Sequence, residues 1–294
     1  MRAGTYPDRT LLRYISPTRY SSQSCPLCWA PRDTWQHRVC TMCTHSEMRN
    51  LTTERHNVGA RHLLRALRRG RHGNHLTIAN IGNSDNALDS AVPATRTRDE
   101  PIEADQIRHE RTIPTWLLPC TCQLSVVCSC PARLCPDILI CHGLTEVPTA
   151  PLTPTRQIQI QFIEFCFSIE SGDILSVSSA FRRKINYYRE ALRAIWLRGW
   201  GIYGACDPTN PNTMLPDTTA LVVGTCAAIP VQTIDALTTD CGLTLRESHA
   251  LATQWVSAAA GFATSLLTTH ARLARNAAAA TQPTVIAHQP ASPL

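Results

Sequence analysis

Four cysteines in two pairs have the residue type and the spacing that metal binding needs. Cys25 and Cys28 form one C-x-x-C pair, and Cys40 and Cys43 form a second pair after eleven intervening residues. A C-x-x-C turn aims two thiolates at one point, and two such turns complete the tetrahedral Cys₄ shell that structural zinc prefers. The spacing therefore predicts a zinc site at Cys25, Cys28, Cys40 and Cys43.

Other interpretations of these pairs stay open. His37 or His45 can replace one cysteine in the zinc shell. A redox C-x-x-C motif or cysteines without a ligand are further alternatives, although a redox motif needs only one pair, at a helix start after a strand. A closed four-ligand site has no open coordination position, so the predicted zinc is a structural cofactor. The sequence predicts no catalytic residue.

A second cluster places seven ligand-type residues within 23 positions: Cys120, Cys122, Cys128, Cys130, Cys135, Cys141 and His142. The spacing allows one zinc ion with spare thiols or two zinc ions, and it gives no ligand partition. Three prolines that flank the cluster favour knuckle-like turns over a regular helix. The alternative is a run of buried cysteines in a small apolar core, since cysteine is among the most buried residue types.

Arginines surround the apolar stripe of a helix that the pattern predicts over 54–71, namely Arg61, Arg65, Arg68, Arg69 and Arg71. These arginines are the predicted nucleic-acid or partner-binding residues. They can bind phosphates, serve as a nuclear-import signal, or form a solvated face. Of the chain's 28 basic residues only Lys184 is a lysine. This bias suits planar recognition of phosphate or carboxylate, and coding bias is an equal explanation.

Signatures of enzymes are scarce in the sequence. It contains no GxxxxGK[ST], HExxH or GxSxG motif. Residues 199–204 match G-x-G-x-x-G by letter, but they follow a predicted helix and lack the β-α-β context of a dinucleotide site. No small-molecule substrate is evident. The sequence therefore predicts a protein that is not an enzyme, with a cysteine- or zinc-centred enzyme as an alternative.

Both helices and strands are predicted to position these residues. The periodicity predicts helices over 54–71, 178–197 and 244–275 and a strand over 157–167. Thr244 and Glu247 have the spacing of a capping box at the start of the last helix. We expect an α+β fold that leans towards helix. It begins with a small N-terminal zinc module, followed by a Cys-rich mixed domain and an Ala-rich helical C-terminal region.

Composition and charge predict five segments: a zinc-knuckle module with the basic helix (1–76), a linker (77–112), a Cys-rich mixed α+β domain (113–205), an Ala/Thr-rich helical region (206–280) and a disordered tail (281–294). The start of the chain has no apolar stretch of signal-peptide length, which favours the nucleus or cytoplasm. The longest uncharged stretch, 249–271, contains Gln and two His, so membrane association is not expected.

One segment resembles a known viral family. The segment 181–190 ends in Tyr188, Arg189 and Glu190 and lies downstream of a Cys-x-Cys cluster, as in the large early-region regulatory protein of adenoviruses. The resemblance covers roughly 120–190. It implies a zinc-dependent nuclear adaptor that recruits a cullin ubiquitin ligase. The double C-x-x-C and the Ala/Thr-rich C-terminal region depart from that family.

These observations together predict a zinc-stabilised nuclear regulatory adaptor, of viral origin if the resemblance holds, that binds protein partners, nucleic acid or both. The first alternative is a nucleic-acid-binding protein that acts through the arginine helix; its affinity would fall steeply with salt. A chain of which much is poorly ordered is a further alternative.

Overall fold

The computed structural model of the chain describes residues 9–16, 22–40, 42–81, 107–108, 113–120, 130–134, 136–149, 151–168, 175–204, 218–225 and 227–280. The chain divides into two compact units, one formed by 1–52 with 262–294 and the other by 53–261. The helices α3 (Ser46–Arg69) and α7 (Leu245–Ala280) contribute residues to both units. The fold is mixed α/β and helix-rich, in agreement with the predicted α+β class.

A mixed sheet forms the centre of the larger unit. Its described strands are β1 (Leu76–Ala79), β2 (Ile107–Arg108), β3 (Ile138–His142), β4 (Gln159–Ser168), β5 (Gly201–Ile202) and β6 (Thr219–Gly224). They follow the order β2-β1-β3-β4-β5, and β6 also pairs with β4. The β1–β3 and β3–β4 pairs are antiparallel, and the β1–β2, β4–β5 and β4–β6 pairs are parallel. The short β5 pairs with the start of β4, and β6 pairs with its second half.

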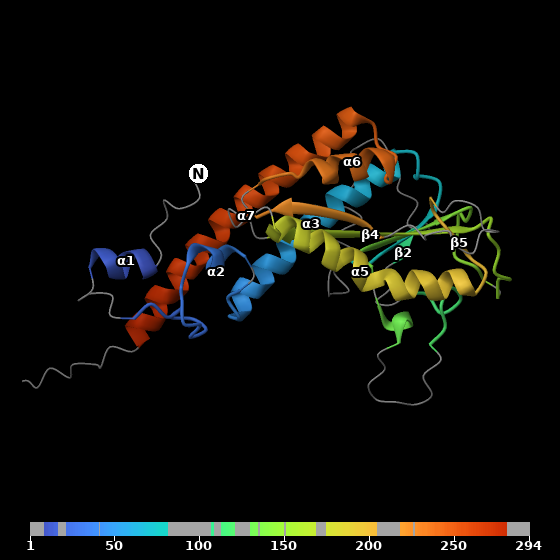
Figure 1. Ribbon diagram of the computed structural model, residues 1–294. Coiled ribbons are helices and arrows are strands. Elements are labelled where there is room, and N and C mark those ends of the chain that lie inside the picture. The colour runs from blue at the N-terminus through green and yellow to red at the C-terminus, as the bar shows by residue number, and fades with distance from the viewer. Residues whose placement is uncertain are drawn as a thin grey trace, which may run out of the picture. The chain divides into compact units, whose positions relative to one another are not determined.

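Both faces of this sheet are covered by helices (Figure 1). On β3, Ile138 and Ile140 belong to the apolar core on one face, whereas Leu139 and Cys141 belong to the core on the other. The first core includes residues of α3, α6 (Val231–Thr239) and α7, and the second includes residues of α5 (Leu175–Leu197). A sheet covered on both faces explains why every residue of β1, β3 and β6 is buried.

The smaller unit has little apolar core. It contains α1 (Arg9–Ile15), α2 (Trp35–Val39), the start of α3 and the end of α7. Its buried cluster consists of Cys25, Cys43, Met48 and Leu266, with four partly buried apolar residues packed against them. A core of this size gives little hydrophobic stabilisation, and small modules usually add a metal or crosslink.

The predicted elements agree with the observed ones apart from their ends. The predicted strand over 157–167 is β4, and the predicted helix over 178–197 is α5, which begins three residues earlier at Leu175. The capping box is confirmed, because the Glu247 carboxylate accepts from the Thr244 backbone N–H at 2.7 Å and the Glu247 N–H donates to Thr244 Oγ1 at 3.2 Å.

The largest correction concerns the basic helix, α3. It begins at Ser46 rather than at 54, because Met48 and Leu51 extend its apolar stripe into the core of the smaller unit. The predicted linker from 77 to 112 starts inside β1, whose residues are all buried. Most of that segment and the predicted tail 281–294 lie outside the described residues. Among the helices that are described, none combines the length and apolar character that crossing a membrane requires.

Candidate metal centre

Four ligand-type side chains converge in the smaller unit. Cys25, Cys28, His37 and Cys43 each place a ligand atom within 4.8 Å of the others. The Sγ atoms of Cys25 and Cys43 are 4.0 Å apart, and Cys28 Sγ lies 3.2 Å from Nε2 of His37. Thiolates about 2.3 Å from a tetrahedral zinc ion stand about 3.8 Å from one another. The group can therefore hold a metal ion with small adjustments.

Local backbone hydrogen bonds shape the two halves of this group. In the first half, the N–H of Trp29 donates to the Cys25 carbonyl at 2.9 Å, and the N–H of Cys25 donates to Ala30 at 2.9 Å. Trp29 closes the turn with a φ of 61°, a left-handed conformation that is rare for a bulky residue. This tight turn brings the thiols of Cys25 and Cys28 together.

The second half is built on the short helix α2. Thr34 caps it by accepting the N–H of His37 at 3.2 Å, so His37 occupies the first turn of the helix. The N–H of Cys43 donates to the His37 carbonyl at 3.1 Å. This hydrogen bond holds Cys43 beside His37.

Cys40 was predicted as a ligand, and it lies outside this group. It is buried and forms the C-cap of α2, where its N–H donates to the Gln36 carbonyl. His37, one helical turn earlier, takes the fourth position. His45, the other histidine considered from the sequence, is also outside the group. Cys40 instead ends the helix α2, which also carries His37.

A buried ion pair, Asp33 with Arg38, lies next to the ligand group. Arg38 donates to both carboxylate oxygens of Asp33 at 2.8 Å, and the two side chains are 7% and 0% exposed. His270 Nε2, from the end of α7, lies 3.5 Å from Asp33 and 3.4 Å from the Cys25 sulfur. Cys25, Asp33 and His270 therefore form a second, overlapping set of ligand atoms. Partners of this kind orient metal ligands in known sites.

The protonation of the ligands fits metal binding. The hydrogen bond between the two thiols lowers the pKa of Cys43, and together with burial it raises the pKa of Cys25 to about 12. Of the two thiols, Cys43 therefore loses its proton first as pH rises. Burial lowers the pKa of His37, so this imidazole is neutral at pH 7 and has a lone pair to offer.

The described members of the second predicted cysteine cluster lie in separate places. Among its described members, Cys120 and Cys130 lie with their sulfurs 3.3 Å apart, while Cys141 is buried in the sheet core on the α5 side. His142, adjacent in sequence to Cys141, faces the other side because successive strand residues alternate. The remaining members, Cys122, Cys128 and Cys135, lie outside the described residues.

His142 instead lies close to His72 and His75, two histidines that the sequence analysis did not identify. His72 and His75 place their ring nitrogens within 4.8 Å of those of His142. The H-x-x-H spacing of the pair was a signal that could have identified them. Asp33 and His270 were also missed, and no local spacing connects His270 with Cys25, since 245 positions separate them in the chain.

The predicted binding arginines have different environments. Arg61 pairs with Glu54, and Arg68 donates to the backbone carbonyls of Gly73 and His75. These two side chains therefore contribute to the helix and to the turn that follows it. Burial lowers the pKa of Arg65. Arg69 and Arg71 are exposed, and Arg71 donates to the Tyr203 hydroxyl at 2.8 Å.

Comparisons with known proteins do not identify the chain. No family model, no curated protein and no solved structure matches it. The resemblance to the adenoviral regulatory family therefore stays a prediction, and the function has to be inferred from the sites themselves.

Proposed function

We propose that the protein is a zinc-stabilised regulatory adaptor in which Cys25, Cys28, His37 and Cys43 hold a structural zinc ion. The observation that carries the proposal is the convergence of three sulfurs and one imidazole nitrogen within 4.8 Å. Three cysteines and one histidine are a ligand set of structural zinc sites. A shell with four protein ligands leaves no position for a substrate, so the zinc holds the module in shape and the activity is binding.

Zinc would provide stability that the smaller unit lacks. Its apolar cluster is small, and two of the four fully buried members are the ligands Cys25 and Cys43. Binding of zinc is worth about 10–16 kcal/mol in zinc-finger peptides at pH 7, and this free energy becomes folding free energy when the site forms only on folding. Removal of zinc should therefore unfold this unit.

The exposed side chains around the ligands favour a protein partner. Trp29 is 79% exposed and Met42 is 53% exposed, and each adjoins a ligand in sequence. An exposed tryptophan held in an unfavourable backbone conformation costs stability, which is reasonable at a surface that contacts a partner. Among the predicted binding arginines, Arg61, Arg68 and Arg71 make contacts within the chain. A nuclear protein partner is therefore the primary proposal, and phosphate binding through the arginines is the alternative.

Metal analysis of the purified full-length protein tests the zinc site. The set compares wild type with C25S/C28S, H37A and C40S. We expect C25S/C28S and H37A each to lose one zinc ion and C40S to keep it. If C40S loses the zinc and H37A keeps it, the Cys₄ site predicted from the spacing is correct instead. If no variant changes the zinc content, the proposal fails.

Partner binding is tested on the zinc-loaded protein. W29A should retain zinc and lose crosslinks to a nuclear protein, whereas Y187A, which removes another exposed aromatic ring, should keep them. Binding to duplex DNA or RNA is measured over a range of salt concentrations. A steep fall in affinity with salt, reduced by R69Q/R71Q, would favour the nucleic-acid alternative. Unchanged crosslinks in W29A would contradict the proposed surface.

A further inference from the structure

Three histidines from two separate segments meet in the larger unit. His72 and His75 lie in the turn between α3 and β1, and His142 is the last residue of β3. The antiparallel register pairs Leu76 with Cys141, so its continuation sets His75 opposite His142. The ring centroids of His72 and His75 lie 4.7 and 4.9 Å from that of His142. One nitrogen from each ring lies within 4.8 Å of the other two.

His72 is buried with unsatisfied hydrogen-bonding groups. The side chain is 3% exposed, and within the described part of the chain neither of its ring nitrogens makes a hydrogen bond of good geometry, although the backbone of Asp240 lies close to the ring. A buried polar atom without a partner costs about 1–3 kcal/mol. Folded proteins rarely retain such atoms without a ligand, an ion or a water molecule to satisfy them.

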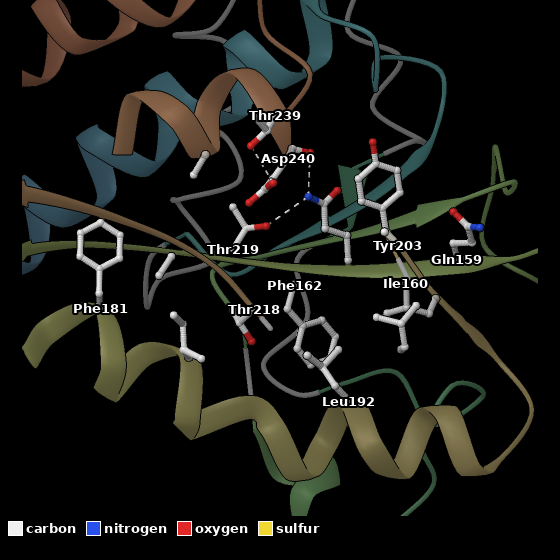
Figure 2. Close-up of a pocket in the computed structure, with 16 residues that line it drawn as sticks. Gln159, Ile160, Phe162, Phe181, Leu192, Tyr203, Thr218, Thr219, Thr239 and Asp240 are labelled. Atoms are coloured by element: carbon white, nitrogen blue, oxygen red, sulfur yellow. Dashed lines mark hydrogen bonds between the residues drawn. The ribbon is translucent and has the colours of Figure 1, made fainter. Parts of the chain in front are cut away.

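The neighbours of His142 fix which of its nitrogens is available. The side-chain amide of Gln161 donates to Thr219 Oγ1 at 3.3 Å and to the Asp240 carbonyl at 2.9 Å (Figure 2). Its oxygen therefore faces Nε2 of His142, at 2.9 Å, and accepts a hydrogen bond from the Nε2–H group. With Nε2 protonated, Nδ1 has the free lone pair. A histidine whose second nitrogen donates to a fixed acceptor is the usual arrangement around a bound metal.

Tyr203 and the Gly143 backbone are further neighbours of the three histidines. The ring of Tyr203 stacks on His142 with centroids 4.1 Å apart, and it meets His72 edge to face at 5.5 Å. His75 is half-buried, and its Nδ1 lies 3.5 Å from the N–H of Gly143, at the outer limit of a hydrogen bond. Imidazole nitrogens about 2.1 Å from a tetrahedral ion stand about 3.4 Å apart, so a metal would draw the three rings closer.

From this arrangement we propose that His72, His75 and His142 bind a divalent first-row transition metal ion. Imidazole suits zinc, copper, nickel and iron, and no carboxylate belongs to the group, which disfavours magnesium and calcium. The site is separate from the cysteine site and does not depend on it.

Three protein ligands leave a coordination position open, in contrast to the closed cysteine site. Metal sites with three protein ligands carry water or substrate in the fourth position. Gln161 and Tyr203, which contact His142, also line a cavity of about 720 Å³, shown in Figure 2 with Tyr203, Thr219 and Asp240 at its wall. Arg71, which donates a hydrogen bond to the Tyr203 hydroxyl, has its positive charge close enough to act on His72 and His142, and this charge favours hydroxide or another small anion as the fourth ligand.

The test uses full-length protein with zinc or cobalt alone as the probe. Metal analysis compares wild type, C25S/C28S, H75Q and H72Q with H249Q, which removes an exposed histidine of the same unit. We expect H75Q and H72Q to lose one metal ion, with affinity for it reduced by more than about 100-fold, since partners in the second shell alone are worth 10–100-fold. H249Q should change nothing, and C25S/C28S should keep this ion while it loses the other.

Cobalt absorption separates the two sites independently of stoichiometry. The cysteine site should give sulfur-to-cobalt charge-transfer bands that C25S/C28S abolishes, and the remaining cobalt should show only the weaker bands of nitrogen and oxygen ligands. These weaker bands should disappear in H75Q, whose half-buried position makes it the variant least disturbing to the fold. The proposal is overturned if H75Q and H72Q remain folded by circular dichroism and bind as much metal as wild type. The three rings would then be an aromatic cluster only.

Discussion

Replacement of Asp33 by Asn tests whether the ion pair behind the cysteine site stabilises the smaller unit. Asn has nearly the same size as Asp, but it removes the charge and replaces one of the two acceptor oxygens by an NH₂ donor. Arg38 would then be left 7% exposed without the carboxylate that accepts its two 2.8 Å hydrogen bonds. Removal of one partner of a buried ion pair typically costs 3–5 kcal/mol, because the remaining charge is desolvated without compensation.

Hydrogen–deuterium exchange of the zinc-loaded protein measures this loss where it occurs. Tenfold in an opening equilibrium corresponds to about 1.4 kcal/mol, so D33N should accelerate exchange in α2 (Trp35–Val39) by about 10²- to 10³-fold or more. The matched control replaces both partners by apolar residues of similar size, D33L/R38M. Since no charge is then left buried, exchange should return close to the wild-type rate.

Two results would refute this reasoning. An acceleration below tenfold in D33N would mean that Arg38 finds water or another acceptor at little cost. A double variant as unstable as D33N would mean that the packing and hydrogen bonds of the pair matter and the unpaired charge does not. The zinc content of D33N should stay at the wild-type value under native conditions, because Asp33 is not among the four proposed ligands.

Two further predictions concern the larger unit. Burial acts to lower the pKa of His56, but its hydrogen bond and charge interaction with Asp137 outweigh this and raise the pKa above 6.5. The pair therefore stabilises the fold fully below pH 6.5 and loses this contribution as pH rises through the folded-state pKa of His56. In urea titrations, H56Q should lower the free energy of unfolding more at pH 6 than at pH 8. An equal loss at both pH values would contradict this prediction. A Cβ on Gly59 would clash with the buried Phe165 ring, whereas one on Gly261 meets nothing within 4 Å. By thermal unfolding G59A should destabilise by about 1–3 kcal/mol and G261A should stabilise by about 0.4–1 kcal/mol, and similar effects of the two would show that the contact is absent.

Much of the secondary structure could be read from local patterns. The capping box at Thr244 and Glu247, the alternation in β4 and the periodicity of α5 each depend on residues a few positions apart. The start of α3 was missed by eight residues, because the burial of Met48 depends on Leu266 in a distant helix. Sequence periodicity cannot show a stripe whose partner is more than 200 positions away.

The candidate sites were also predicted only in part from local sequence spacing. The sequence by itself determined that Cys25, Cys28, Cys40 and Cys43 are metal-ligand candidates, and a local C-x-x-C turn does bring the thiols of Cys25 and Cys28 together. Only the structure decided that His37 stands where Cys40 was expected, because the helix that carries His37 ends at Cys40 and brings the imidazole to the three sulfurs. It also separated Cys141 from His142 onto opposite faces of the sheet and joined His142 to His72 and His75. Strand pairing between 76–79 and 138–141 fixes that neighbourhood, and pairing of distant segments leaves no mark in the spacing along the chain.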